Sequence, residues 1–419
     1  MSVGARPEAL RVALLTYRGN PRSGGQGVYV RHLSRALARL GHAVEVLSGP
    51  PYPELDAGSG VRLTRLPSLD LYRPEAPFRR ARPVGGAVDL LELATMWTAG
   101  FPEPLAFSLR AWTLLRRRRA DFDVVHDNQC LGYGLLGVRR SGLPVLATVH
   151  HPIQVDRRLE LAHAPRGRRP LIRRWYGFTR MQGRVARRLP RLVTVSEAAR
   201  EEIVRELRVP HERIAVVPNG VDADLFRPLP EAARHRGRLV ATASADVPLK
   251  GLEPLLRGFA MVRARRPAEL VVVGRPRPNG PTARLMDDLG LDGSVRFVSG
   301  LEETDLAALY AGSEAAVVPS LYEGFSLPAA EAMACGLPLV ATTAGALPEV
   351  VGGDGEAALL VPPGDPAALA GGMLTLLDDA ALRRRLGGRG RERVLRRFTW
   401  EAAARATVEQ YREVGAPVC

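Results

Sequence analysis

Short apolar, β-branched runs alternate with helix-like segments along the whole chain, and this alternation constrains the fold more than any other feature of the sequence. Strands that alternate with helices are typical of parallel sheets wound with crossover helices. The expected strands of the first half are Arg11–Thr16, Ala43–Ser48, Val124–His126, Val145–His150 and Leu192–Ser196. Those of the second half are Leu239–Ala243, Leu270–Gly274, Val295–Val298, Ala315–Pro319 and Leu339–Ala341. The pattern predicts an α/β fold with two doubly wound, Rossmann-like sheets.

The length of 419 residues supports two domains, because one hydrophobic core rarely serves a chain of more than about 250 to 300 residues. The segment 218–230 is rich in turn-forming residues and marks a boundary. We expect a first domain at 1–218, a linker at 219–235, a second domain at 236–397, and at 398–419 a helix that packs back on the first domain. Residues 50–110 contain many Pro and Gly, and we expect them to be irregular. Ligands of doubly wound folds bind beyond the carboxyl ends of strands, so the active site is expected in a cleft between the domains.

The net positive charge is confined to the first half of the chain. Residues 1–218 carry a net charge of +17 and residues 219–419 a net charge of −2. The excess peaks at 157–191, where 12 arginines accompany the single acid Glu160, and a second cluster is Arg116–Arg119. Such a surface should attract an anionic partner, which we expect to be an anionic acceptor or an anionic membrane. The alternative is the solvated surface of an arginine-rich protein. Binding of nucleic acid is disfavoured, because interleaved aromatic residues for base stacking are missing.

The chain begins without a basic segment followed by an apolar one, and no apolar run approaches the roughly 18 residues that a membrane span needs. We therefore expect a cytoplasmic protein, with the basic half able to contact the inner face of the plasma membrane. The three cysteines, Cys130, Cys335 and Cys419, are far apart and odd in number. This argues against a disulfide framework or a zinc site.

Two carboxylates eight residues apart, Glu323 and Glu331, follow the expected strand at Ala315–Pro319. Pro328 suits the first turn of a helix, which puts Glu323 in a loop and Glu331 on the helix. Such carboxylates can accept hydrogen bonds from ribose and sugar hydroxyls, although a solvated helix with two ordinary acids is the alternative. Backbone amides near a helix start suit phosphate. The residues concerned are Gly324, Phe325, Ser326 and Leu327.

Lys250 is the only lysine of the chain, whereas the other 58 of its 59 basic residues are arginine. An ammonium group is a compact point charge and a guanidinium group is a broad planar fork, so a tight site beside phosphate can require lysine. The alternative is chance, which would place the single lysine at a given basic position about once in 59. Lys250 is therefore our first candidate for a phosphate contact.

The segments 319–338, 342–349 and 360–365 together resemble the family 4 glycosyltransferases. Ser23-Gly-Gly25 followed by a helix, and the segments 193–196 and 218–222, extend the similarity into the first half, while 50–110 and 152–185 do not compare. The resemblance implies a GT-B fold, a nucleotide-sugar donor and retention of the anomeric configuration. It also implies that Lys250 contacts the diphosphate, Glu323 the sugar and Glu331 the ribose.

Two features of the first half are candidates for contacts with the donor. Gly24 and Gly25 lie between the first strand and a helix expected from about Val28 to Leu40, and without Cβ atoms they let the backbone approach a diphosphate. A plain turn is the alternative. His150 ends an expected strand, and by resemblance it matches the family histidine near the transferred sugar. A structural histidine is the alternative, with His151 as the second candidate. The expected catalytic residues are thus His150, Lys250 and Glu323.

The sequence departs from the family pattern before Lys250. The family usually has an arginine about five residues earlier, and this chain has Ser244-Ala-Asp246 there. Either Lys250 acts with backbone help alone, or another residue such as Arg275 replaces the arginine. The pair Asp222 and Asp224 matches a D-x-D metal pattern, but it lies in the expected linker. GT-B enzymes generally use no bound metal, so the resemblance implies neither a metal nor another cofactor.

Transfer of a sugar from a nucleotide-sugar to a hydroxyl acceptor, anionic or lipid-linked, is the activity that the resemblance implies, with UDP favoured over GDP. A nucleotide-sugar 2-epimerase on the same fold is the first alternative, and a basic nucleic-acid-binding protein is a weaker one. A phosphorylase of related fold would need a lysine for pyridoxal phosphate, and the single lysine is better explained by a diphosphate.

Overall fold

The computed structural model describes residues 9–20, 25–73, 78–229, 234–243 and 247–416, which fold into two compact units. The first unit contains the chain up to Val195, Ala199–Val217 and the residues from Ala403 onward. The second unit contains Ser196–Ala198 and Pro218–Ala402. The C-terminal end of the chain is thus part of the first unit, although the chain reaches it only after completing the second.

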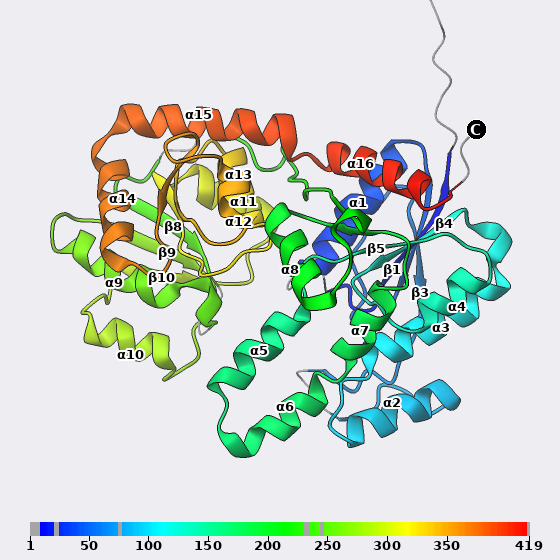
Figure 1. The fold of residues 1–419 in the computed structure, drawn as a ribbon. Helices are drawn as coiled ribbons and strands as arrows, with labels where there is room; N and C mark the ends of the chain where they lie inside the picture. Colours follow the sequence, from blue (N-terminus) through cyan, green and yellow to red (C-terminus); the bar gives the residue numbers. More distant parts are fainter. Residues whose placement is uncertain (1–8, 21–24, 74–77, 230–233, 244–246, 417–419) are drawn as a thin grey trace, which may run out of the picture. The chain divides into compact units, whose positions relative to one another are not determined.

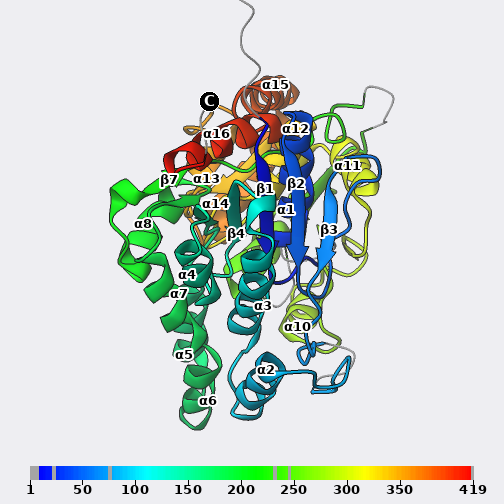
Figure 2. The same cartoon turned by 90° about the vertical axis from the view of Figure 1, so that its right-hand side faces the viewer.

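A parallel sheet with the strand order β3-β2-β1-β4-β5-β6-β7 forms the centre of the first unit (Figure 1). Figure 2 shows its edge, where β1, β2 and β3 lie side by side. The strands are β1 Arg11–Thr16, β2 Ala43–Ser48, β3 Arg62–Arg65, β4 Val124–Asn128, β5 Val145–Thr148, β6 Leu192–Thr194 and β7 Ile214–Val216. The helices are α1 Gln26–Arg39, α2 Ala87–Trp97, α3 Glu103–Arg117, α4 Gly134–Arg140, α5 Ile153–His163, α6 Arg169–Trp175, α7 Phe178–Ala186, α8 Glu197–Leu207 and, for most of its length, α16 Trp400–Glu413.

The second unit has a parallel sheet with the order β10-β9-β8-β11-β12-β13. Its strands are β8 Arg238–Thr242, β9 Glu269–Val273, β10 Val295–Val298, β11 Ala315–Val318, β12 Leu339–Thr342 and β13 Ala358–Val361. Its helices are α9 Leu252–Arg263, α10 Pro281–Asp288, α11 Glu303–Ala311, α12 Leu327–Ala334, α13 Leu347–Val351, α14 Pro366–Asp378 and α15 Ala380–Arg397. The predicted pair of doubly wound sheets is confirmed.

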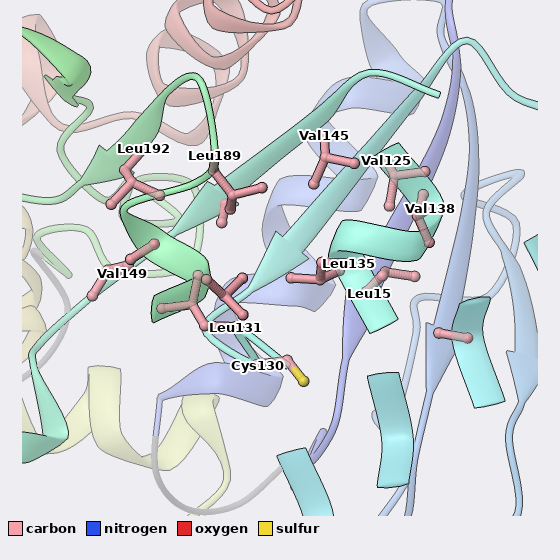
Figure 3. Close-up of a cluster of buried hydrophobic side chains, with 14 of the residues drawn as sticks. Leu15, Val125, Cys130, Leu131, Leu135, Val138, Val145, Val149, Leu189 and Leu192 are labelled. Atoms are coloured by element: carbon pink, nitrogen blue, oxygen red, sulfur yellow. The ribbon is translucent and has the colours of Figure 1, made fainter. Parts of the chain in front are cut away.

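The central strands are buried on both faces, which is why they appear in the sequence as continuous apolar runs. Alternate residues of neighbouring strands supply one core of the first unit, and α4 covers it with Leu135 and Val138 (Figure 3). The thiol of Cys130 lies in this same core. Cys335 is also buried, and Cys419 lies outside the described residues. The two buried thiols, Cys130 and Cys335, are thus part of the packed interior.

The expectation that residues 50–110 are irregular is wrong. They contain β3, all of α2 and the first half of α3. Buried ion pairs, in addition to apolar contacts, hold these helices together: the Arg110 guanidinium lies 2.6 Å from Asp89 and 2.5 Å from Glu92. Hydrophobic periodicity does not detect such a junction. The short strands β7 and β13 were likewise not expected.

Several predicted boundaries shift by one or two residues. The strand expected at Val145–His150 ends at Thr148, so His150 lies in the loop beyond it. The first helix begins at Gln26 rather than near Val28. Within the described ranges, none of the helices combines the length and the apolar composition that a membrane span needs.

Candidate active site

Lys250 stands in the second unit at the end of a 3₁₀ turn between β8 and α9. Gly251 follows it with φ of 63°, and a Cβ there would lie only 1.9 Å from the carbonyl oxygen of Pro319. Glycine is therefore required for this turn to pack against the loop after β11. The packing places the Lys250 ammonium 2.9 Å from Glu323 Oε1, with a third of the lysine side chain still exposed.

Glu323 is buried, and neighbouring residues fix its position. Its Oε1 also accepts a hydrogen bond from the Ser320 hydroxyl at 2.7 Å, and its carbonyl oxygen accepts one from the Ala346 amide at 2.9 Å. Gly345 has φ of 55°, and a Cβ there would lie 2.3 Å from the same carbonyl. The loops after β11 and β12 therefore hold this carboxylate jointly. Ser320 and Gly345 were not among the predicted site residues.

The N-terminus of α12 presents the second polar feature of this unit. Ser326 precedes the helix in a left-handed conformation with φ of 80°, and Pro328 occupies the first turn as predicted. The buried Ser326 hydroxyl has no hydrogen-bond partner among the described residues. Phe325 is buried against Phe398, with 5.6 Å between the ring centroids. A helix start with an unused hydroxyl beside it is suited to bind an anion.

Glu331 lies on α12, one turn further along, so the predicted division of the two acids between loop and helix is confirmed. Burial raises the pKa of the Glu331 carboxyl to about 8, and the nearby Glu303 acts in the same direction. Such a carboxyl group is mostly protonated near neutral pH. Its charge is therefore hard to sustain without a ligand.

The glycine loop of the first unit is described only in part. Gly24 lies outside the described residues. Gly25 has φ of 69° and precedes α1, where its carbonyl oxygen accepts the amide of Tyr29. A Cβ on Gly27 would lie 2.1 Å from the Asn20 carbonyl oxygen, so Gly27 also needs to be glycine, which the sequence interpretation did not recognise.

His150 is held by the polar residues that end β4. The amide of His150 donates to Gln129 Oε1 at 2.7 Å, and its ring Nε2 lies 2.8 Å from Asn128 Oδ1. Because the Asn128 Nδ2 points to the Gln26 carbonyl oxygen at 3.5 Å, Oδ1 faces the histidine and can only accept. His150 Nε2 must then carry the proton, which leaves Nδ1 with a lone pair.

Burial lowers the pKa of His150 to about 4, and the adjacent His151 adds to this, so the ring is neutral at pH 7. His150 can therefore accept a hydrogen bond at Nδ1, but it holds no proton there to donate. His151 turns elsewhere, with its Nε2 2.8 Å from Asp156. His150 and His151, which the sequence left as alternatives, therefore have different hydrogen-bond partners.

The polar run His126-Asp127-Asn128-Gln129 fills the last three positions of the buried strand β4 and the first position after it. Burial raises the pKa of Asp127 to about 7, while the amide of Leu131 donates to its carboxylate at 2.9 Å. Four polar residues at the carboxyl end of a buried strand are unusual, and this signal could have identified Asn128 and Gln129 from the sequence.

Comparison with known proteins agrees with this geometry. The family model described as Glycosyltransferase Family 4 matches residues 23–225, and the one described as Glycosyl transferases group 1 matches 236–379. The chain is 55% identical over 412 residues to the MMP alpha-(1->4)-mannosyltransferase of Mycolicibacterium hassiacum, covering 98% of this chain and 99% of the relative. This chain belongs to the family 4 glycosyltransferases.

Two further similarities place this glycosyltransferase among its relatives. It is 31% identical over 443 residues to the D-inositol 3-phosphate glycosyltransferase of Kineococcus radiotolerans, which covers 96% of this chain and 95% of the relative. Among solved structures it resembles sucrose-phosphate synthase from Thermosynechococcus elongatus, with a TM-score of 0.72, 26% identity, and coverage of 97% and 99%. The fold is GT-B, as expected, and the protein is an enzyme.

The other charged candidates of this glycosyltransferase lie outside these clusters. Asp222 Oδ1 accepts the amides of Asp224 and Leu225, each at 3.3 Å, in the segment between the sheets. No group of three or more potential metal ligands occurs in the part of the chain that the structure describes. Arg275 is exposed in the loop after β9, and residues 244–246, which replace the family arginine, lie outside the described ranges.

Proposed function

We propose that this glycosyltransferase transfers a mannosyl residue from a nucleotide-activated donor to a hydroxyl acceptor, with formation of an α-(1→4) linkage. The support is the 55% identity to a relative whose name specifies that sugar and that linkage. Nucleotide-activated mannose holds its sugar in the α configuration, so an α-linked product corresponds to retention. Mannose is ordinarily carried by GDP, which moves the expected nucleotide from UDP to GDP.

The arrangement around Lys250 is the observation that carries the donor half of the proposal. The Lys250 ammonium lies 2.9 Å from Glu323, which precedes the start of α12 at Leu327 by one short loop. We assign the diphosphate to Lys250 and to the backbone of Gly324, Phe325, Ser326 and Leu327. Negative charge develops on the departing diphosphate, and fixed cations and amide dipoles stabilise it in the transition state. Electrostatic stabilisation is then the main contribution to rate.

The carboxylates and the histidine complete the assignment. Glu323, once its lysine turns to phosphate, can accept a hydroxyl of the transferred sugar, and Glu331 can accept the ribose hydroxyls. His150 Nδ1 can accept a further sugar hydroxyl, because Nε2 holds the proton. Gly24 and Gly25 are assigned to the diphosphate from the first unit. No side chain is required as a covalent nucleophile, since the acceptor attacks on the face that the diphosphate leaves.

The test is a screen of the purified enzyme against GDP-mannose, UDP-glucose, UDP-N-acetylglucosamine and GDP-glucose, with α-linked manno-oligosaccharides as acceptors. We expect turnover with GDP-mannose and an α-(1→4) product in the proton NMR spectrum. A β-linked product would contradict retention. Conversion of a UDP-sugar to its 2-epimer without an acceptor would favour the epimerase alternative.

We also propose that neither metal nor cofactor is needed. Loss of turnover in chelator, restored by Mg²⁺ or Mn²⁺, would contradict this.

The basic surface of the first unit suggests an anionic partner. Arg116, Arg117 and Arg119 are exposed around an open hollow of about 610 Å³, and most arginines of 166–188 are exposed as well. We propose that this surface contacts anionic lipid at the inner face of the plasma membrane, where a lipid-linked or anionic acceptor would be found. Sedimentation with phosphatidylglycerol vesicles should deplete the enzyme at low salt and leave it in solution at high salt. Equal recovery with neutral vesicles would refute membrane contact.

A further inference from the structure

A chain of buried hydrogen bonds runs through the first unit from its C-terminal helix to its sheet. The hydroxyl of Tyr411, on α16, lies 2.8 Å from His126 Nδ1. His126 Nε2 lies 2.7 Å from the Thr148 hydroxyl, which in turn lies 3.2 Å from the hydroxyl of Tyr29 on α1. All four residues are buried. Four segments far apart in the sequence are thus joined through side chains alone.

The last member of this hydrogen-bonded chain, Tyr29, contacts His150 of the candidate site. The edge of the Tyr29 ring meets the ring of His150, with 4.5 Å between centroids and 81° between planes. Of the two strands that contribute to this hydrogen-bonded chain, β4 contacts His150 directly and β5 leads into it along the sequence. Asn128, its hydrogen-bond partner, lies two residues after His126 on β4, and Thr148 lies two residues before it on β5. Each group that orients the His150 ring therefore either belongs to this hydrogen-bonded chain or lies next to one of its members.

The donor and acceptor roles along this hydrogen-bonded chain are coupled at His126. Burial lowers the pKa of His126 to about 3, so its ring is neutral, with one nitrogen donating and the other accepting. One of the two hydroxyls, that of Tyr411 or that of Thr148, must then donate to the ring while the other accepts from it. The role of Thr148 in turn constrains its hydrogen bond with Tyr29. Loss of the Tyr411 hydroxyl would leave a buried ring nitrogen without its partner and free the tautomer of His126.

We infer that Tyr411 and His126 are positioning residues for His150, so that the C-terminal helix α16 takes part in building the catalytic site. The inference rests on the proposed role of His150 toward the transferred sugar. It explains why the polypeptide, on returning to the first unit in α16, carries a buried tyrosine there rather than a phenylalanine, which has no hydroxyl. A tyrosine hydroxyl is normally buried only when it has a partner, and here that partner leads to the site.

The first test compares Tyr411→Phe with a matched control on the same helix. Thr407 is also buried on α16, but its hydroxyl donates to the Ala403 carbonyl oxygen within the helix, so Thr407→Val removes a buried hydroxyl without touching the chain. We expect kcat to fall about 10-fold in Tyr411→Phe, with the donor KM changed less than about 2-fold, because a misplaced ring affects the reacting geometry. Thr407→Val should keep kcat within about 2-fold.

A double-mutant cycle shows whether Tyr411 acts through His150. Adding Tyr411→Phe to His150→Ala should change kcat by less than about 2-fold, since the group that it positions is already gone. A further 10-fold loss would mean that the two residues act independently, and would overturn the inference. Thr148→Val interrupts the chain at its centre and should repeat this non-additivity if Tyr411→Phe folds poorly.

A measurement without turnover separates this inference from the proposed function. In enzyme labelled with ¹⁵N-histidine, the ring signals of His150 should report protonated Nε2, and they should shift in Tyr411→Phe but not in Thr407→Val. Unchanged His150 signals in Tyr411→Phe would overturn the inference even if the donor were still unidentified. Failure of the wild-type enzyme to use any nucleotide sugar, with the signals shifting as expected, would count against the proposed function alone.

Discussion

The two units hold their candidate site residues by opposite means. In the second unit an ammonium and a carboxylate lie in direct contact, partly exposed and drawn from two neighbouring loops. In the first unit the candidate histidine is neutral and is held by uncharged groups from α1, β4 and the loop between β4 and α4. The contrast matches the division of labour that we propose. The charged residues lie where we propose that the diphosphate departs, and the neutral hydrogen-bonding residues lie where we propose that the sugar is oriented.

The residues of the two candidate clusters are held in place in different ways. Around Glu323, glycines at 251 and 345 allow backbone segments to meet closely, and the contacts follow from loop geometry. Around His150, geometry depends on a hydrogen-bonded chain whose donor and acceptor roles are coupled at His126. The charged cluster should therefore tolerate distant changes, whereas the neutral one should not.

The largest effect is expected for Lys250→Ala. Loss of the cation beside the departing diphosphate should lower kcat about 10³-fold, because one fixed charge in a poorly hydrated site is worth several kcal/mol in the transition state. The same change should weaken binding of the product nucleoside diphosphate at least about 10-fold by calorimetry. Lys250→Arg should recover only part of the loss, since the guanidinium is broader than the turn at Gly251 allows.

His150→Ala provides the counterpart to this change. It should lower kcat while leaving the affinity for the free nucleoside diphosphate within about 2-fold, because His150 is assigned to the sugar and not to the phosphates. Equal losses of nucleotide affinity in both variants would remove the proposed division between the units. Near-normal turnover in Lys250→Ala would refute the assignment of the diphosphate site.

The sequence predicted the charged cluster far better than the neutral one, for a physical reason. Lys250, Glu323 and Glu331 could be identified because each is a charged residue in a short segment, and the segments themselves resemble a family. Ser320 and Gly345 act through contacts between loops, which spacing along the chain does not reveal. The link from Tyr411 to His126 spans 285 residues and depends on how α16 packs. Both sheets could be predicted because their strands are buried on both faces, whereas 50–110 could not, since ion pairs help to hold its helices.

A smaller effect is expected for Glu331→Gln, which tests whether this acid on α12 is kept for binding at the expense of stability. The folded pKa of about 8 exceeds the ordinary 4.5, so folding favours the protonated form. Its contribution to stability is complete below pH 4.5 and is lost as the pH rises through 8. The amide cannot ionise. Glu331→Gln should therefore melt higher than wild type at pH 9, by a smaller margin at pH 6 and nearly equally at pH 4, while its donor KM rises about 10-fold.

Glu303 allows a control for this prediction. It is the neighbouring acid that helps to raise the pKa of Glu331, so Glu303→Gln should recover part of the stability at pH 9. Because Glu303 is not assigned to the donor, KM should stay within about 2-fold in this variant. A Glu331→Gln variant with normal KM would show that the carboxyl does not contact the ribose.

The smallest effect concerns acid and is expected in the first unit. His126 and His150 have folded pKa values of about 3 and 4, below the ordinary 6.5, so the unfolded chain takes up two protons that the folded unit excludes. Their contribution to stability is complete above pH 6.5 and is lost as the pH falls toward 4. Near pH 5 each should add up to about 1.4 kcal/mol per pH unit to the slope of unfolding free energy. His150→Ala should reduce this slope by about one such step in urea titrations at pH 6.5 and 5. An unaltered slope in His150→Ala would mean that this histidine is solvated in the folded enzyme, and the neutral, buried character of the first site would then be wrong.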